Sequence, residues 1–365
     1  MTQDSVSTGR GGRPSNQLAA TLRQEIATGR LAGGDFLPTE RELAIRHQVA
    51  RKTVGRALNM LAAEGLIQSS PRHGHKVLAR AHDPVRGAPL AYVRHTVQEP
   101  ERWGPLHGQL LTAFEAMAGS RGWSLLAVTS RGRAVEEVFE QLRAARVCGA
   151  ILDTNDSELL RLVRAAGMPA VMVDAWVEGC GFDSVVQDSY LGGLQAARWL
   201  LSRGHRRIGW FGEVARSFHS RERFGGAAAI LGEEDLHIPG EFRVDPYGED
   251  VDGALRRLLA RPDRPTGVLA LWREQTLKLV GAARAMGLEP GRDIDVVGWA
   301  TEEQYEAEFR AALAGGPVPP AAVWSVRQMA EAAMLRLVER RANPAMAPVQ
   351  IRIPTQLRFA DNKEV

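Results

Sequence analysis

Short apolar runs alternate with amphipathic segments from residue 90 to residue 298, and this rhythm constrains the fold of the chain most strongly. The apolar runs fall at residues 90–93, 124–128, 149–152, 169–173, 184–186, 208–211, 268–271 and 295–298. The segments between them carry apolar residues at helical spacing. Because strands buried on both faces are continuously apolar, the alternation predicts parallel sheets covered by helices on both sides.

The same rhythm starts again after Asp188, with a predicted helix over residues 191–202. Two doubly wound units in succession are typical of a hinged pair of lobes that closes on a ligand. We therefore expect an α/β region over residues 89–360, with two lobes that meet near residue 188 and close on a ligand.

The N-terminal part of the chain carries a different pattern, that of a helix-turn-helix followed by a β-hairpin wing. Thr39 and Glu42 have the spacing of a capping box, so a helix is expected to begin there. A second helix is expected from Arg51, because apolar residues recur there at helical spacing. Two short strands, 66–69 and 76–78, follow it. The expected boundaries are a tail over 1–12, a winged-helix domain over 13–80 and a linker over 81–88.

Charge is distributed unevenly along the chain. Residues 1–80 hold twelve Lys and Arg against six Asp and Glu, whereas the whole chain has a net charge of only +3. The second helix places Arg51, Lys52 and Arg56 on its open face. Such a face can be merely solvated, but a positive excess confined to this segment favours contact with DNA phosphates.

This segment resembles the winged helix-turn-helix of GntR-type regulators. The matching residues are Leu37 to Ala44, Val49 to Val54, Ala57, Leu58, Leu61, Glu64 to Ile67 and Gly74. The resemblance implies that Arg41, Arg51 and Gly74 contact duplex DNA. The full set of residues expected at the DNA is Arg41, Arg51, Lys52, Thr53, Arg56, His73 and Gly74.

Two positions depart from the GntR pattern. Ala50 stands where Ser or Thr is usual, so the second helix loses its side-chain cap and one phosphate contact. Gly55 stands where a DNA-contacting Arg is common, and Arg56 is no simple substitute because one residue turns the side chain by about 100°.

The remainder resembles the effector domain of LacI-type regulators, and the fusion is similar to AraR-type transcriptional regulators. The resemblance rests on residues 185–209, 220–226, 287–298 and 326–330. It implies a small-molecule ligand, favoured as a sugar or sugar derivative. It implies that Arg221 binds the ligand. Arg223 is the competing candidate for this role, and an ion pair is the alternative role of Arg221. Asp188 faces either the ligand or the hinge.

Residues at strand ends complete the expected effector site. Trp272 follows a predicted strand, where it can stack on a ring or fill the core. The residues expected at the effector are Asp153, Asp188, Arg221, Trp272 and Arg273. Arg273 replaces part of an Asn-Asp pair, and Ala300 replaces an Asp that accepts hydrogen bonds from sugars in the family. Because of these changes, an anionic or nucleoside-like ligand is an alternative. Another alternative is that Asp153 or Asp174 accepts the hydrogen bonds of a sugar ligand.

Other classes of protein lack support in the sequence. Cys148 and Cys180 form no metal motif or disulfide framework, which suits a reducing cytoplasm. We identify no secretory leader, membrane span or catalytic motif, and expect no metal or cofactor. The prediction is a cytoplasmic homodimeric repressor that binds duplex DNA and a small effector; a DNA-tethered enzyme acting on that ligand is the remaining alternative.

Overall fold

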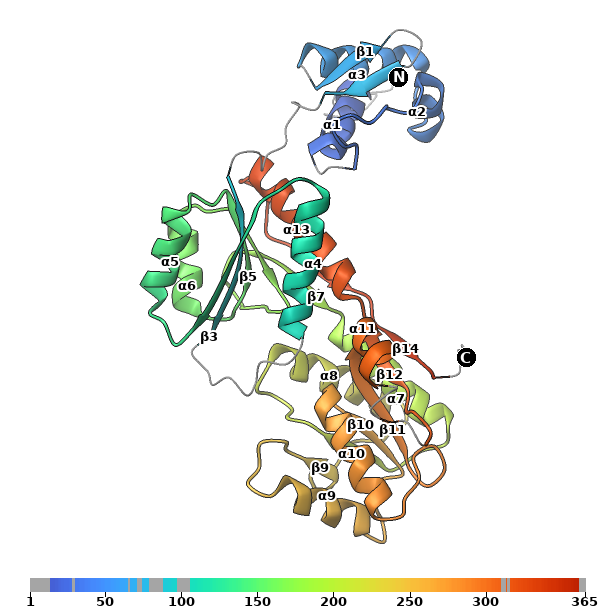
Figure 1. The fold of residues 1–365 in the computed structure, drawn as a ribbon. Helices are drawn as coiled ribbons and strands as arrows, with labels where there is room; N and C mark the ends of the chain where they lie inside the picture. Colours follow the sequence, from blue (N-terminus) through green and yellow to red (C-terminus); the bar gives the residue numbers. More distant parts are fainter. Residues whose placement is uncertain are drawn as a thin grey trace, which may run out of the picture.

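The computed structural model describes residues 14–27, 30–64, 66–70, 74–78, 88–96, 106–309, 313 and 316–360. A winged-helix domain lies at one end of the molecule, and two α/β lobes follow it (Figure 1). The predicted fold class is confirmed. The expected tail and nearly all of the expected linker lie outside the described residues.

The winged-helix domain contains three helices and a hairpin. They are α1 (Pro14–Ala27), α2 (Glu40–Arg46), α3 (Arg51–Ala63), β1 (Ile67–Ser70) and β2 (Gly74–Val77). Thr39 caps α2 through the predicted capping box with Glu42. Ala50 gives α3 no side-chain cap, also as predicted. The strands pair antiparallel, and Leu22, Leu43 and Leu58 are buried between the helices.

Lobe 1 contains residues 88–96, 106–187 and 326–353, and its sheet is entirely parallel in the part of the chain that the structure describes. The strand order is β13-β7-β6-β5-β3-β4. The strands are β3 (Leu90–Thr96), β4 (Leu125–Arg131), β5 (Gly149–Asp153), β6 (Ala170–Val173), β7 (Asp183–Gln187) and β13 (Gln350–Ile353). Helices α4 (Leu106–Ser120) and α13 (Val326–Ala342) cover one face, and α5 (Val135–Ala144) and α6 (Ser157–Ala165) cover the other.

Lobe 2 consists of residues 189–324 and 356–360, and repeats this arrangement with one antiparallel edge. The strand order is β14-β12-β11-β10-β8-β9, in which β14 is antiparallel to β12. The strands are β8 (Ile208–Phe211), β9 (Arg243–Val244), β10 (Gly267–Ala270), β11 (Asp295–Thr301), β12 (Ala321–Trp324) and β14 (Gln356–Arg358). The main helices are α7 (Ser189–Ser202), α8 (Phe218–Gly232), α9 (Val251–Ala260) and α10 (Arg273–Ala285). Short helical turns, α11 (Glu302–Gln304) and η3 (Tyr305–Phe309), follow β11.

The chain passes between the lobes where β7 leads into α7, where β12 leads into α13, and where β13 leads into β14. The first of these crossings is the one predicted near residue 188. Because the two sheets are joined by short connections at one boundary, the lobes can change their mutual angle while each core stays packed.

A buried ion cluster fixes α13 to the sheet of lobe 1. Asp183 is fully buried at the start of β7 and is paired with Arg336 at 2.9 Å and Arg340 at 2.7 Å. The backbone N–H of Val349 also donates to its carboxylate. Burial alone raises the pKa of Asp183, but the hydrogen bonds from Arg340 and Arg336 outweigh burial, so its pKa lies below the usual range.

We expect Asp183→Asn to destabilise lobe 1 by about 3 kcal/mol at pH 7, because two arginines lose their buried counter-charge. The folded-state pKa of Asp183 is lowered, so its stabilisation is present above the unfolded pKa of about 3.9 and is lost as the pH falls through the folded value. Urea unfolding of both proteins at several pH values measures this. Equal stability at pH 7 contradicts the prediction.

Candidate functional site

A cavity of about 590 Å³ lies between the two lobes, at the carboxyl ends of their strands. This volume suits a small organic ligand. Lobe 1 lines it with Leu106, His107, Asn155, Asp174 and Gln187. Lobe 2 contributes charged and aromatic residues, among them Glu213, Arg216, Arg223, Trp272, Arg273 and Trp299.

Arg223, on α8, is the central cation of this cleft. Arg223 is only 1% exposed. Its guanidinium carbon lies 4.0 Å from the centroid of the Trp272 ring and 3.7 Å from that of the Trp299 ring. It donates hydrogen bonds to the Leu271 carbonyl and, at 2.7 Å, to Gln187 Oε1. Burial lowers the pKa of Arg223, and the two indole faces offset part of the cost of burying its charge.

Two glycines bring α8 close enough to α7 to place Arg223 there. A Cβ atom on Gly193 would lie 2.1 Å from the Arg223 carbonyl oxygen, and one on Gly226 would lie 2.1 Å from that of Tyr190. No real side chain tolerates such distances. The paired glycines in the sequence therefore serve the close crossing of these two helices.

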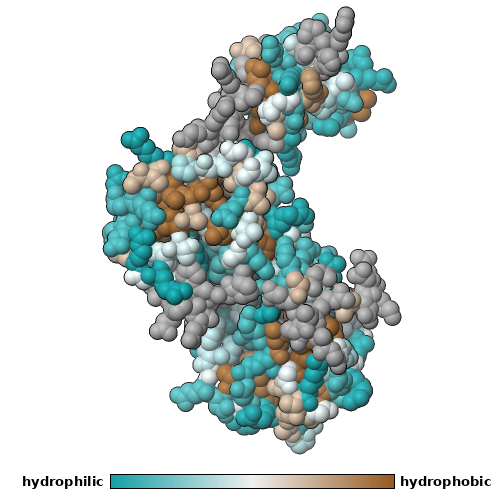
Figure 2. Space-filling view, viewed as in Figure 1, coloured by the Kyte–Doolittle hydropathy of each residue, from teal (hydrophilic) through white to brown (hydrophobic). Residues whose placement is uncertain are grey.

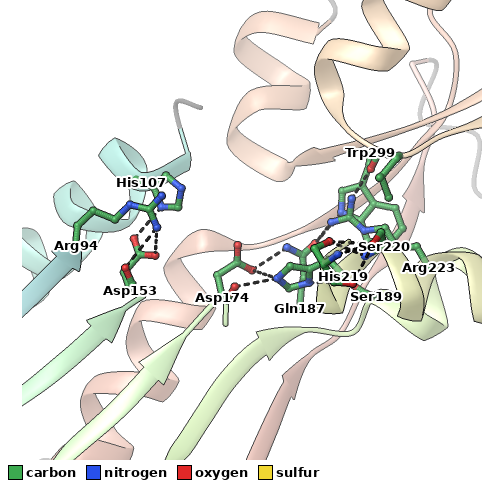
Figure 3. Close-up of polar contacts among 12 residues, drawn as sticks. Arg94, His107, Asp153, Asp174, Gln187, Ser189, His219, Ser220, Arg223 and Trp299 are labelled. Atoms are coloured by element: carbon green, nitrogen blue, oxygen red, sulfur yellow. Dashed lines mark hydrogen bonds and ion pairs between the residues drawn. The ribbon is translucent and has the colours of Figure 1, made fainter. Parts of the chain in front are cut away.

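A hydrogen-bond network joins the lobes beside Arg223 (Figure 3). Gln187, in lobe 1, accepts from Trp299 Nε1 at 2.8 Å and donates to Asp174 at 2.8 Å. His219, on α8 of lobe 2, contacts the Asp174 carbonyl through Nε2 at 2.9 Å and Ser189 through Nδ1 at 3.1 Å. These contacts hold lobe 2 against lobe 1 directly under the cleft.

A second polar cluster supports the lobe 1 wall. Asp153, at the end of β5, contacts Tyr92 Oη at 2.5 Å, Arg94 Nη1 at 2.6 Å and His107 Nδ1 at 2.7 Å. Burial raises the pKa of Asp153, yet the opposing effects of His107 and Arg94 leave it below its usual range. Burial also raises the pKa of Tyr92. The cluster therefore fixes His107, which lines the cavity.

Trp272 and Arg273, which the sequence places at the effector, both line the cleft. Arg273 Nη1 lies 3.5 Å from Glu274 Oε1. Asp153 lies behind the wall and reaches the cleft only through His107.

Arg221 and Asp188 are not among the residues that line the cleft, so the structure corrects the expectation for Arg221 in favour of the competing Arg223 and leaves Asp188 with its alternative role at the lobe crossing. Arg221 is exposed and donates to the Ala215 carbonyl at 3.1 Å. Two residues along a helix turn the side chain by about 200°, which is why Arg223 points inward instead. Asp188 caps α7 by accepting from Leu191 N at 3.0 Å, and lies 3.5 Å from Arg352.

Sequence reasoning did not identify Gln187, Glu213 or Trp299 as cleft residues. Gln187 and Trp299 belong to strands that end at the cleft, and Glu213 follows shortly after such a strand. Polar or aromatic residues at the carboxyl end of an apolar run were the available signal.

The winged-helix domain presents the predicted basic face to solvent. Arg41, Arg51, Lys52 and Arg56 are exposed, and none of them has an ion pair in the part of the chain that the structure describes. Thr53 is half-buried. Gly74 opens β2 with a φ of +86°, a value that favours glycine. The expected DNA contact of His73 lies outside the described residues.

Comparison with known families divides the chain in the same way. Residues 14–77 match the family described as bacterial regulatory proteins, gntR family, and residues 197–359 match the periplasmic binding protein-like domain. The chain thus resembles a gntR-family regulatory domain followed by a periplasmic binding protein-like domain. No helix among the described residues is long and apolar enough to cross a membrane. These residues also contain no cluster of three or more potential metal-binding side chains.

The part of the chain after the winged helix is similar in sequence to bacterial repressors. The ribose operon repressor of Escherichia coli (strain K12) is 29% identical over 203 residues, which are 53% of this chain and 61% of the repressor. The match thus spans less than two thirds of that relative. The PurR repressor of Serratia proteamaculans (strain 568) is 25% identical over 72% of this chain and 80% of its own length. The lac repressor dimer bound to operator shares the fold, with a TM-score of 0.61 and 20% identity over 74% of this chain and 93% of that one.

We expect His219 to remain neutral at pH 6.5. Burial lowers its pKa and outweighs the opposing effect of the Asp174 carboxylate. Since the folded-state pKa is lowered, His219 contributes stability above the unfolded pKa of about 6.5, and less as the pH falls below it. Ring-nitrogen NMR of the effector-free chain measures the protonation, with exposed His237 as a reference signal. A charged His219 ring at pH 6.5 contradicts the prediction.

Proposed function

We propose that this chain is a transcriptional repressor whose operator affinity is controlled by a small ligand in the interlobe cleft. The observation that supports this most directly is the joining of a winged helix with a free basic face to a two-lobed receptor. DNA-bound protein at a promoter blocks polymerase by occupancy, so repression needs no further surface. Such a protein acts in the cytoplasm, where its DNA lies.

The proposed assembly is a homodimer on a palindromic site. One winged helix covers a short half-site, and two-fold symmetry doubles it. Apolar residues gather on the visible face of lobe 1 beside α4 (Figure 2), and a second copy can cover such a face. Sedimentation of the free chain and of its operator complex tests the assembly, and a monomer in both contradicts it.

A sugar or sugar derivative is the proposed effector. Indole rings, arginines and carboxylates together line the cleft, which suits a ring that both donates and accepts hydrogen bonds. The name of the ribose operon repressor supports the same class. Three lining arginines, Arg216, Arg223 and Arg273, keep an anionic or nucleoside-like ligand as the alternative.

One group of residues near the cleft superficially resembles the catalytic triad of an enzyme. Ser189, His219 and Asp174 are joined in the order of a hydrolase triad. However, Ser189 has no exposed surface, so its hydroxyl cannot reach a bound ligand. We therefore propose a receptor rather than an enzyme.

Helix α13 supplies the physical connection between the cleft and the DNA-binding domain. It follows β12, whose last residue, Trp324, lines the cleft. Seventeen residues later, about 26 Å along the helix axis, it reaches the end of lobe 1 that faces the winged helix (Figure 1). There Glu339 accepts a hydrogen bond from Gln24 of α1 at 2.6 Å. A displacement of α13 at its Trp324 end can thus be transmitted along this helix to its contact with α1.

Operator binding tests the proposed function. We expect Arg51→Ala to weaken operator binding by roughly 1–3 kcal/mol if the arginine contacts a base, or to flatten the log–log salt slope by about one if it contacts phosphate. Arg256→Ala removes an equally exposed arginine from lobe 2 and serves as the control. Fluorescence anisotropy over a salt series measures both, and wild-type behaviour of Arg51→Ala contradicts the assigned surface.

Coupling between the domains is tested at α1. We expect Gln24→Ala to retain operator binding but to reduce the effect of bound effector on it, about fivefold or more, because coupling free energies between sites are typically 1–3 kcal/mol. Gln17→Ala, an exposed glutamine on the same helix, is the matched control. The measurement is operator affinity with and without the effector; unchanged coupling in Gln24→Ala contradicts the route.

A further inference from the structure

Glu213 presents a buried carboxylate oxygen that has no hydrogen-bond partner among the described residues. The residue is 6% exposed, lies two positions after β8 and lines the cleft. Its Oε1 accepts from Ser217 Oγ at 3.3 Å, whereas Oε2 is buried without a hydrogen-bond partner. A buried carboxylate oxygen left unpaired is costly, so its partner is missing from the protein alone.

The missing partner must be a hydrogen-bond donor, because an ionised carboxylate only accepts. The terminal nitrogens of two arginines in the cleft are engaged elsewhere. Arg216 pairs with Asp245 at 3.2 Å, and Arg223 donates through Nη1 to the Leu271 carbonyl and through Nη2 to Gln187. The buried Nε of Arg223 has no hydrogen-bond partner among the described residues, so it does not pair with Glu213 either. A ligand in the cavity is therefore the available source of the donor.

The charge around Glu213 favours a neutral donor. The charges of the Asp174 and Glu213 carboxylates favour the charged form of the buried Arg223 guanidinium and so raise its pKa against the effect of burial. Glu213 thus already has a counter-charge and needs no ligand cation. An anionic group placed at Oε2 would be repelled.

A second unpaired acceptor lies on the same wall. Gln275 lines the cleft from the first turn of α10, and its Oε1 is buried without a partner. An amide can be turned to offer N–H₂ instead, so Gln275 adapts to a donor or an acceptor, whereas Glu213 does not.

We propose that Glu213 is a specificity-determining residue that accepts a hydrogen bond from a hydroxyl group of the effector. It selects neutral, hydroxylated ligands against anionic ones, and it supplies the acceptor that the chain lacks at Ala300. This inference rests on the proposed ligand-binding function of the cleft.

The test uses the full chain with Glu213→Met, which keeps the side-chain length and removes the acceptor, and Glu213→Gln, which keeps an acceptor without charge. Exposed Glu233→Gln is the matched control. Each protein is titrated, with its melting temperature as the readout, against three sets of compounds. The neutral set is D-ribose, D-glucose, cellobiose and adenosine; the anionic set is D-gluconate and D-ribose 5-phosphate; the cationic set is D-glucosamine.

We expect at least one neutral compound to raise the melting temperature of the wild type and of Glu233→Gln. Its affinity for Glu213→Met should fall about tenfold or more, as for a lost hydrogen bond to a charged group, with Glu213→Gln in between. The ligand-free melting temperature of Glu213→Met should change little, since removal of the unpaired buried carboxylate oxygen offsets the loss of its charge near Arg223 and of its hydrogen bond with Ser217.

Several results overturn the assignment. They are stabilisation by the anionic or cationic set alone, no response to any neutral compound, an equal response of Glu213→Met, or a lower ligand-free melting temperature of that variant, which would mark Glu213 as structural. Operator binding by the ligand-free wild type is measured in parallel. Loss of operator binding refutes the repressor proposal and leaves the ligand assignment standing, so the two failures are distinguishable.

Discussion

A buried guanidinium between two indole rings is the interaction on which the rest of the cleft depends. Arg223 is 1% exposed and forms no direct ion pair with a described residue; the faces of Trp272 and Trp299, a backbone carbonyl and Gln187 contact its guanidinium, while the carboxylates of Asp174 and Glu213 act on it from farther away. These partners come from both lobes. Arg223 therefore connects the two lobes at the cleft.

At the opposite end of lobe 1, a buried carboxylate is paired directly with two arginines. Asp183 is buried with two arginines from α13, so this helix moves with the sheet of its own lobe and not independently. Because α13 is rigid and extends from the cleft to α1, a movement of one end of this helix also moves its other end. The cleft and α1 can be coupled in this way. The soft elements are the crossings between the lobes, where no sheet continues. The molecule thus keeps its flexibility at the lobe boundary and its rigidity along α13.

Local patterns predicted the elements well because their causes are local. The capping box at Thr39, the uncapped start of α3 at Ala50 and the continuous apolar strands each depend on residues that are near in sequence. The site was predicted less well. Arg221 and Arg223 differ by two positions, yet only the packing of α8 against α7, through Gly193 and Gly226, decides which one is buried. Asp188 caps a helix, while its neighbour Gln187 reaches the cleft.

The sequence by itself determined the class of each domain, the order of strands and helices along the chain, and the basic face of the winged helix. Those features follow from periodicity, capping and net charge, which act between residues close in the chain. The tertiary structure alone decided which polar groups meet in the cleft and which of them lack a partner. Glu213 Oε2 has no partner among the described residues, and the terminal nitrogens of Arg216 and Arg223 bond to residues distant in sequence; these pairings can be known only from the arrangement of the residues in space.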